Sequence, residues 1–261
     1  MGCASVSFTS YAESVPLAMD RAGAERLLSG QSLVMVKPNL VNATPFPVTT
    51  PPELCAAIVE YVRAACPAAR VVVAEGTGEP SLTTMEVFDR LGYVQMAKQA
   101  GVELVDLDCE PTVTLADPSR KVFPEMVLPE IAIEAFLISA PVLKAHSLAA
   151  MTGTLKNMMG LAPASHYSGR GGFWRKAVFH QPMQESVMDL NAYRLPDFTV
   201  MDATVGLAEY HLGGATLDPP PNLLLAGDDP YAVDREAAGL LGLDWRAVPH
   251  VANRADTDRK A

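Results

Sequence analysis

The chain has 261 residues, of which 49% are hydrophobic, and its net charge is −10. A chain of this length buries enough apolar surface for one domain, or for one domain with a smaller lobe. The acidic balance argues against nucleic acid and anionic membrane surfaces as partners, because both attract basic proteins. No apolar run approaches the roughly 18 residues of a membrane span, and the first residues lack the charged and apolar regions of a signal peptide.

The four cysteines are scattered and form no C-x-x-C pair (Cys3, Cys55, Cys66 and Cys109). Neither zinc-ligand spacing nor iron–sulfur spacing is present, so we expect no iron–sulfur cluster. Scattered thiols are typical of proteins in a reducing compartment, which favours a cytoplasmic location.

Six short apolar runs that end in turn residues predict strands buried on both faces. They lie at 32–37, 69–75, 101–108, 134–140, 197–203 and 222–227, and helical patterns lie at 51–65, 86–100, 185–193 and 230–241. This alternation predicts an α/β fold with a mainly parallel sheet and flanking helices. We expect residues 1–250 to form one domain, or two closely joined lobes that meet near residues 110–130, followed by a solvated tail at 251–261.

The segment 162–181 lacks a regular pattern and is rich in glycine and basic residues. A long loop inside a compact domain is usually functional or disordered. We interpret this segment as a mobile lid over a functional site, with Arg170, Arg175, Lys176 and His180 as its candidate residues.

Basic side chains stand where apolar strands end. Lys37 ends the run SLVMVK, and Lys144 follows the run FLISAPVLK, two residues before His146. The carboxyl ends of parallel strands meet at the edge of the sheet where ligands bind. A buried ammonium without a counter-charge is costly, so these lysines need an internal carboxylate or a bound anion. With Lys156 they predict a cationic pocket for a small anionic metabolite; an ion-pair network that only ties strand ends together is the structural alternative.

Neutral and acidic residues near these lysines complete the candidate site. Asn39, Thr152 and Asn157 offer neutral hydrogen bonds to a bound anion. Glu75 and Asp202 each lie near the end of an apolar run, which makes them candidate general bases or ion-pair partners of the lysines.

Two further aspartates are weak candidates for a hard metal ion. Asp229 precedes a proline, as a helix N-cap does, and Asp234 follows about one helical turn later. No ligand spacing supports a metal at these positions, so we expect none. The stretch AEGTGEP lacks the third glycine of a dinucleotide-binding fingerprint, and no nucleophile elbow, P-loop or H-E-x-x-H motif is present.

Six motifs resemble those of a bacterial and archaeal family known as domain of unknown function 362. They are VKPNLV, TTPPEL, VVVAEGTG, the K-x-H followed by TGTLKNMMG, VMDATVGL and GDDPYAVD, and they cover about residues 30–245. Many members carry ferredoxin-type cysteine clusters. This sequence lacks them, so the redox role that such clusters imply does not transfer to this chain.

A fainter resemblance links the chain to the N-terminal part of lactate racemase-like proteins. In those proteins a catalytic histidine stands ten residues before a lysine that anchors a nickel-pincer nucleotide, and His146 precedes Lys156 by the same interval. They also carry an A-x-G-x-H turn, in which Gly78 replaces the histidine here. The resemblance implies a shared architecture and site position, and more weakly the cofactor. The missing histidine argues against racemisation by two bases.

These features favour a small-molecule enzyme whose pocket binds a carboxylate or phosphorylated substrate. Lys37, Lys144 and Lys156 would bind and polarise the anion, and His146 would transfer a proton with Glu75 or Asp202 as its partner. Isomerase or racemase chemistry next to a carbonyl is the reaction class that we favour. The alternative is a non-catalytic accessory protein of redox metabolism that binds an anion or a cofactor.

Overall fold

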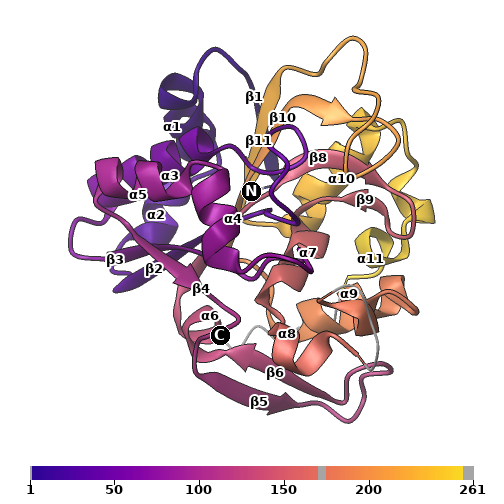
Figure 1. Cartoon of the computed structure of the whole chain (residues 1–261). Helices are drawn as coiled ribbons and strands as arrows, with labels where there is room; N and C mark the ends of the chain where they lie inside the picture. Colours follow the sequence, from indigo (N-terminus) through magenta and orange to yellow (C-terminus); the bar gives the residue numbers. More distant parts are fainter. Residues whose placement is uncertain (1, 170–174, 255–261) are drawn as a thin grey trace.

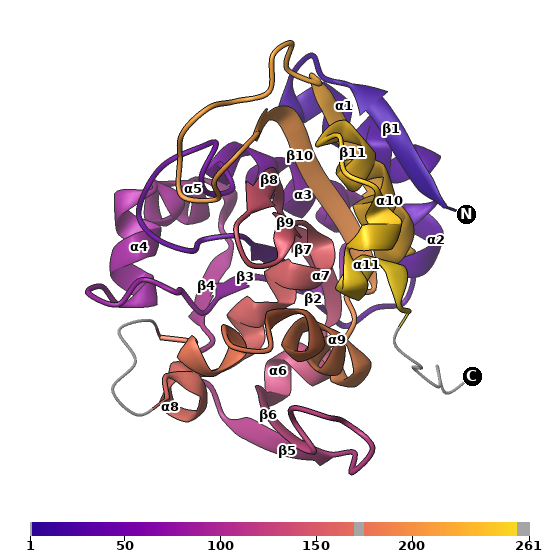
Figure 2. The same cartoon turned by 90° about the vertical axis from the view of Figure 1, so that its right-hand side faces the viewer.

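A mixed, mostly parallel nine-stranded sheet with helices on both faces organises the chain (Figures 1 and 2). The structure, a computed structural model, describes residues 2–169 and 175–254. This architecture confirms the predicted α/β fold. It also confirms all six predicted strands, which recur as β2, β3, β4, β7, β10 and β11.

The sheet has the strand order β1-β11-β10-β7-β2-β3-β4, and β8 extends it by pairing with β10 and β9. The run from β10 through β7, β2 and β3 to β4 is parallel, whereas β1 and β10 pair with β11 in antiparallel fashion. The bounds are β1 Cys3–Ser7, β2 Leu33–Pro38, β3 Arg70–Glu75, β4 Glu103–Asp106, β7 Phe136–Ala140, β8 Val142–His146, β9 Ala150–Thr152, β10 Phe198–Leu207 and β11 Leu223–Gly227.

A separate two-stranded hairpin occupies the stretch where we allowed for a lobe boundary. It consists of β5 (Thr112–Ala116) and β6 (Glu125–Pro129), which pair in antiparallel fashion. Met126 and Leu128 of β6 are fully buried and belong to the same hydrophobic cluster as one face of the large sheet. The hairpin is therefore packed onto the domain at its lower edge in Figure 1.

Eleven helices surround the sheet in the described part of the chain. The bounds are α1 Tyr11–Arg21, α2 Ala24–Leu28, α3 Pro52–Ala65, α4 Thr84–Arg90, α5 Tyr93–Ala100, α6 Glu130–Glu134, α7 Thr154–Asn157, α8 Ala164–Tyr167, α9 Met183–Tyr193, α10 Pro230–Leu240 and α11 Pro249–Ala252. The single helix predicted at 86–100 is two helices, because Gly92 adopts a left-handed φ of 83° between them. None of the described helices has the length and apolar character that crossing a bilayer requires.

Alternate residues of the central strands pack into two hydrophobic cores, one on each face of the sheet. On β2, Met35 packs with the cluster that includes α6 to α11, whereas Val34 and Val36 pack with the cluster that includes α1 to α5. All three side chains are fully buried. The continuous apolar character of these strands follows from this double coverage.

The C-terminal boundary differs from the expected one. Val251 is fully buried in α11 and belongs to one of the two cores. The packed chain therefore extends past residue 250, and most of the expected tail, residues 255–261, lies outside the described residues.

The short helix α7 carries Lys156 and Asn157, and a buried carboxylate of α10 fixes its first turn. Asp234 accepts hydrogen bonds from the backbone N–H groups of Thr154 (2.6 Å) and Leu155 (3.0 Å). Residue 153 must be glycine, since a Cβ there would lie 2.3 Å from Asp234 Oδ1. Burial raises the pKa of Asp234 to about 7, although both backbone hydrogen bonds oppose this rise.

Replacing Asp234 by alanine should destabilise the fold by about 2–4 kcal/mol, because two buried N–H groups of α7 lose their acceptor. Urea unfolding followed by circular dichroism measures this loss. Asp234→Asn is the matched control, since its amide oxygen still accepts one bond, and it should lose less. Equal stability of the alanine variant and the wild type would contradict this role of Asp234.

Candidate functional site

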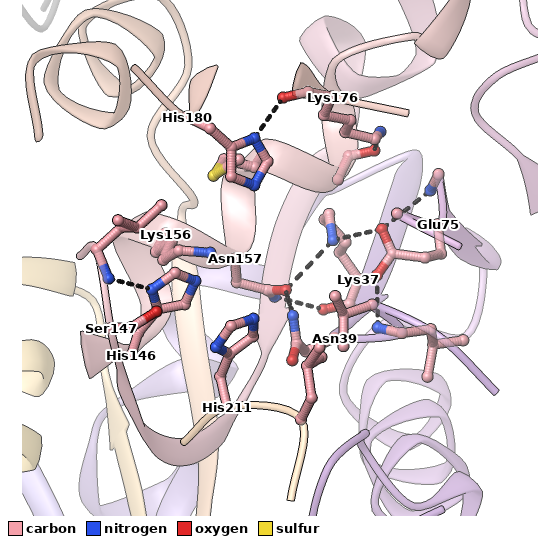
Figure 3. Close-up of a pocket in the computed structure, with 18 of the residues that line it drawn as sticks. Lys37, Asn39, Glu75, His146, Ser147, Lys156, Asn157, Lys176, His180 and His211 are labelled. Atoms are coloured by element: carbon pink, nitrogen blue, oxygen red, sulfur yellow. Dashed lines mark hydrogen bonds and ion pairs between the residues drawn. The ribbon is translucent and has the colours of Figure 1, made fainter. Parts of the chain in front are cut away.

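A cavity of about 240 Å³ opens at the carboxyl ends of β2, β3 and β8 (Figure 3). Figure 3 shows its polar side chains converging from these strand ends, from α7 and from two later segments. Eight residues that sequence reasoning proposed as site or lid residues line it: Lys37, Asn39, Glu75, His146, Lys156, Asn157, Lys176 and His180. The structure thus brings together residues that lie far apart in the sequence.

Lys37 and Glu75 form a buried ion pair on one wall of the cavity. The Lys37 ammonium lies 2.7 Å from Glu75 Oε1, and the two side chains are 0% and 3% exposed. Glu75 also accepts hydrogen bonds from the backbone N–H groups of Leu40 (3.0 Å) and Gly76 (2.9 Å). Burial lowers the pKa of Lys37, and the neighbouring carboxylate offsets part of this effect.

Asn157 of α7 joins this ion pair to the adjacent strands. Its Oδ1 accepts hydrogen bonds from Lys37 Nζ (3.3 Å) and Asn39 Nδ2 (3.1 Å), and its Nδ2 donates to Ser139 Oγ (3.0 Å). Gly160 lets the backbone pass beside the pair, because a Cβ there would lie 2.0 Å from Glu75 Oε1. The position of α7 and the ion pair are therefore linked.

Lys156 is the one cavity lysine whose ammonium has no partner among the described residues. Lys37 has its carboxylate, and Lys176 donates to the carbonyl oxygens of Ala162 (2.6 Å) and Gly160 (3.2 Å). Lys156 Nζ makes neither a hydrogen bond nor an ion pair to any of these residues, although its side chain is largely buried where it lines the cavity. Burial lowers its pKa to about 8. Such a group favours a bound anion.

The backbone fixes which nitrogen of His146 carries the proton. Its Nδ1 lies 3.1 Å from the N–H of Leu148 and 3.2 Å from that of Ala149, so this nitrogen accepts both hydrogen bonds. In the neutral ring the proton then resides on Nε2. Burial lowers the pKa of His146 strongly, and Lys156 lowers it further. His146 therefore stands in the cavity as a neutral Nε2–H donor.

His180 has the opposite arrangement. Its Nδ1 lies 3.1 Å from the carbonyl oxygen of Lys176, which can only accept, so Nδ1 carries the proton and Nε2 keeps its lone pair. Burial lowers the pKa of His180, and the Lys156 charge adds to this effect. The cavity thus contains a histidine that donates and a histidine that accepts.

His211, for which sequence reasoning proposed no role, also lines the cavity. Its ring stacks on that of His146 with centroids 3.8 Å apart, and its buried Nδ1 has no hydrogen-bond partner in the described structure. Burial lowers the pKa of His211 to about 3. It follows the long strand β10 in a loop without any recognisable motif, so the sequence offers no signal for it.

The expected lid is packed against the domain where the structure describes it. Lys176 is 5% exposed, and Phe179 is fully buried. Arg175 does not line the cavity; its Nη1 lies 3.0 Å from Asp108 Oδ2. Arg170 lies outside the described residues. Lys176 and His180 are therefore wall residues of the cavity, and the mobility of the segment stays a prediction.

Three other proposed residues do not line the cavity. The Lys144 ammonium donates to the carbonyl oxygen of Val48 (2.7 Å), and burial lowers its pKa well below the usual value. Asp202 accepts a hydrogen bond from the hydroxyl of Tyr11 (2.5 Å) and so is not the partner of His146. Thr152 is buried on β9 with its hydroxyl unpaired in the described structure. Each group is directed into the protein by its strand.

The two weak metal candidates serve as helix caps. Asp229 accepts a hydrogen bond from the backbone N–H of Tyr231 (3.1 Å) at the start of α10, and Asp234 caps α7 as described above. Among the residues that the structure describes, no three histidine, cysteine, aspartate or glutamate side chains form a group that could hold a metal ion.

These features define an α/β protein with a cationic, histidine-lined cavity at its strand ends. The family described as domain of unknown function (DUF362) matches residues 34–239, and the chain belongs to this family. No curated protein matches it.

Among solved structures, the fold is similar to that of the lactate racemase apoprotein from Thermoanaerobacterium thermosaccharolyticum, with a TM-score of 0.58 and 15% sequence identity. The similarity covers 89% of this chain and 55% of the racemase, so the chain spans about half the length of that protein. At this identity the likeness establishes the fold alone.

The nickel-pincer nucleotide implied by the racemase resemblance finds little room in this cavity. Lys156 has a free amine that suits an anchor. The cavity of about 240 Å³ is nevertheless smaller than the roughly 300–1,000 Å³ typical of sites for drug-sized ligands, and a nucleotide belongs to that size class. The described residues therefore do not fit the cofactor, and we derive no chemical step from it.

Breaking the buried ion pair on one side should be costly. Glu75→Gln leaves the Lys37 ammonium buried without its carboxylate, and we expect a loss of about 3–5 kcal/mol in the free energy of unfolding. The double variant Lys37→Met/Glu75→Gln removes both charges and should be more stable than Glu75→Gln alone. Urea unfolding of the wild type and both variants tests this; a double variant no more stable than Glu75→Gln would contradict the pairing.

Proposed function

We propose that this protein is a small-molecule enzyme that binds a carboxylate or phosphorylated substrate and transfers a proton at the carbon next to a carbonyl, as isomerases and racemases do. The observation that carries the proposal is the Lys156 ammonium, which faces the cavity without a counter-ion among the described residues. The similarity of the fold to an isomerase supports the reaction class.

The charge balance of the cavity favours an anion. Three ammonium groups (Lys37, Lys156 and Lys176) and one carboxylate (Glu75) line it within the described part of the chain, and Asp108 lies 3.9 Å from Lys176 Nζ just outside the lining. Glu75 is engaged by Lys37 and by two backbone N–H groups, so it does not neutralise Lys156. An anionic substrate would supply the missing charge, even though the protein as a whole is acidic.

Two histidines with opposite tautomers supply the groups for proton transfer. His180 Nε2 has a free lone pair and would accept the proton from carbon. His146 carries its proton on Nε2 and would donate a hydrogen bond to the carbonyl oxygen on which negative charge develops. This assignment gives the base role to His180 and replaces the pairing of His146 with Glu75 or Asp202.

The ion pair of Lys37 and Glu75 would have a positioning role. Through Asn157 it fixes α7, and thereby the backbone that carries Lys156. Because these groups are buried and hydrogen bonded before any ligand arrives, the cavity would need little reorganisation during the reaction.

Anion affinity should depend on pH through Lys156. Its pKa of about 8 means that the ammonium is mostly charged at pH 7 and loses its charge above pH 8. Affinity for malonate or lactate, measured by calorimetry, should therefore be constant below neutrality and fall by up to about tenfold per pH unit above that pKa.

Burial also lowers the pKa of Lys176 to about 8. Substitutions at Lys156 separate the contributions of the two lysines. Lys156→Arg keeps its charge across this range and should retain affinity to higher pH, leaving only the Lys176 dependence. Lys156→Met should bind weakly at every pH. An unchanged pH profile in both variants would contradict the role of Lys156.

Proton transfer should appear as exchange of carbon-bound hydrogen with D₂O, followed by proton NMR of small 2-hydroxy and 2-oxo acids. His180→Gln should slow exchange by about 10²–10⁴-fold, because it removes the base. His146→Gln keeps an N–H donor and should lose less than His146→Ala. Tight anion binding without exchange of any of these acids would instead support a non-catalytic binding protein.

A further inference from the structure

We propose that Lys156 acts as a nucleophile and that its Nζ condenses with the carbonyl of a small 2-oxo acid to form an iminium ion. This inference rests on the proposed function and gives it a substrate class and a covalent step. It makes Lys156 more than an anion-binding group.

The contacts of the site lysines distinguish Lys156 from the others. Lys37 binds Glu75, Lys144 donates to the Val48 carbonyl, and Lys176 donates to two carbonyl oxygens. A nucleophilic amine must be able to lose a proton and to approach the carbonyl carbon. The N–H···O bonds of the other three lysines hold their ammonium groups in place, whereas Lys156 Nζ has no partner among the described residues. It also faces the cavity, whereas Lys144 does not line it.

The surroundings of Lys156 favour a neutral amine. Burial lowers its pKa to about 8, so roughly a tenth of the molecules carry a neutral amine at pH 7. Desolvation in the protein interior is one of the conditions that activate a lysine amine as a nucleophile.

The condensation balances without an oxidant or reductant. The Nζ lone pair attacks the carbonyl carbon, and the carbonyl oxygen takes up a proton to give a carbinolamine. Its C–O bond then breaks, water leaves, and a C=N bond forms. The ammonium and the oxo acid thus become an iminium ion and one water, with the total charge unchanged.

The two histidines fit the proton movements of this sequence. The charge on Lys156 lowers the pKa of His146 and of His180, so both rings lie within electrostatic reach of the amine. His180 Nε2 can take a proton from the ammonium, return it to the oxygen that leaves as water, and then accept the proton from the carbon next to the iminium. His146 Nε2–H can donate a hydrogen bond to the oxygen that leaves.

A 2-oxo acid also matches the charge and the size of the cavity. The iminium retains the positive charge of Lys156, so the carboxylate on the adjacent carbon stays paired throughout. Such acids have few heavy atoms, in keeping with a cavity of about 240 Å³. The iminium acidifies the next C–H bond, which links the covalent step to the proposed proton transfer.

Reductive trapping tests the inference. The full chain is incubated with pyruvate and sodium cyanoborohydride, and intact-mass spectrometry with peptide mapping locates the adduct. We expect one pyruvate-derived unit on Lys156, at least about tenfold above the level on any surface lysine, as for an activated amine. Lys156→Arg should lose this adduct, whereas the exposed-lysine control Lys98→Arg should retain it.

The outcomes separate this inference from the proposed function. The controls are malonate binding and circular dichroism of Lys156→Arg, which test whether the variant remains folded. If pyruvate binds and its methyl hydrogens exchange with D₂O, but no adduct forms on Lys156, the covalent step is wrong and the proposed function stands. An equal adduct level in Lys156→Arg would also overturn it. Absence of both binding and exchange for every acid would contradict the proposed function and this inference together.

Discussion

The free-energy cost of burying an ammonium group governs the arrangement of this protein. Lys37 lies at the end of a fully covered strand, where it is stable only because Glu75 lies 2.7 Å away. That requirement places the ends of β2 and β3 beside each other. It also fixes Asn157, which hydrogen bonds to Lys37, and the close backbone passage at Gly160. Lys156, which also lines the cavity, has no such carboxylate in the described structure.

The two hydrophobic cores determine where the cavity lies. Helices cover both faces of the sheet, so polar groups gather at the strand ends, where the backbone leaves the core. The face packed by α10 also contributes Asp234, which holds the first turn of α7 and orients Lys156. A carboxylate far from Lys156 in the sequence thus fixes the helix that carries it.

Sequence reasoning succeeded where one local signal decides the structure. Continuous apolar runs identified the central strands, and their terminal residues Lys37 and Glu75 were placed at the correct edge of the sheet. It failed where side-chain direction decides, because Lys144 and Asp202 also lie on strands near that edge but point to the Val48 carbonyl and to Tyr11.

The histidines show the same limit. The tautomers of His146 and His180 depend on backbone groups at hydrogen-bonding distance, which no spacing rule contains. His211 reaches the cavity only because its loop folds back onto His146. The hairpin β5–β6 was missed because its strands are short and partly exposed, and so lack the apolar run of a central strand.

The ionisation of Lys156 is the most direct measure of an unpaired cation in this cavity. Carbon-13 NMR of the lysine ε carbons, with the Lys156 signal identified by its absence in Lys156→Arg, reports the pKa of this amine with and without malonate. We expect a pKa of about 8 in the free protein and a rise when malonate is bound. An ordinary lysine pKa that malonate does not change would contradict the central role of Lys156.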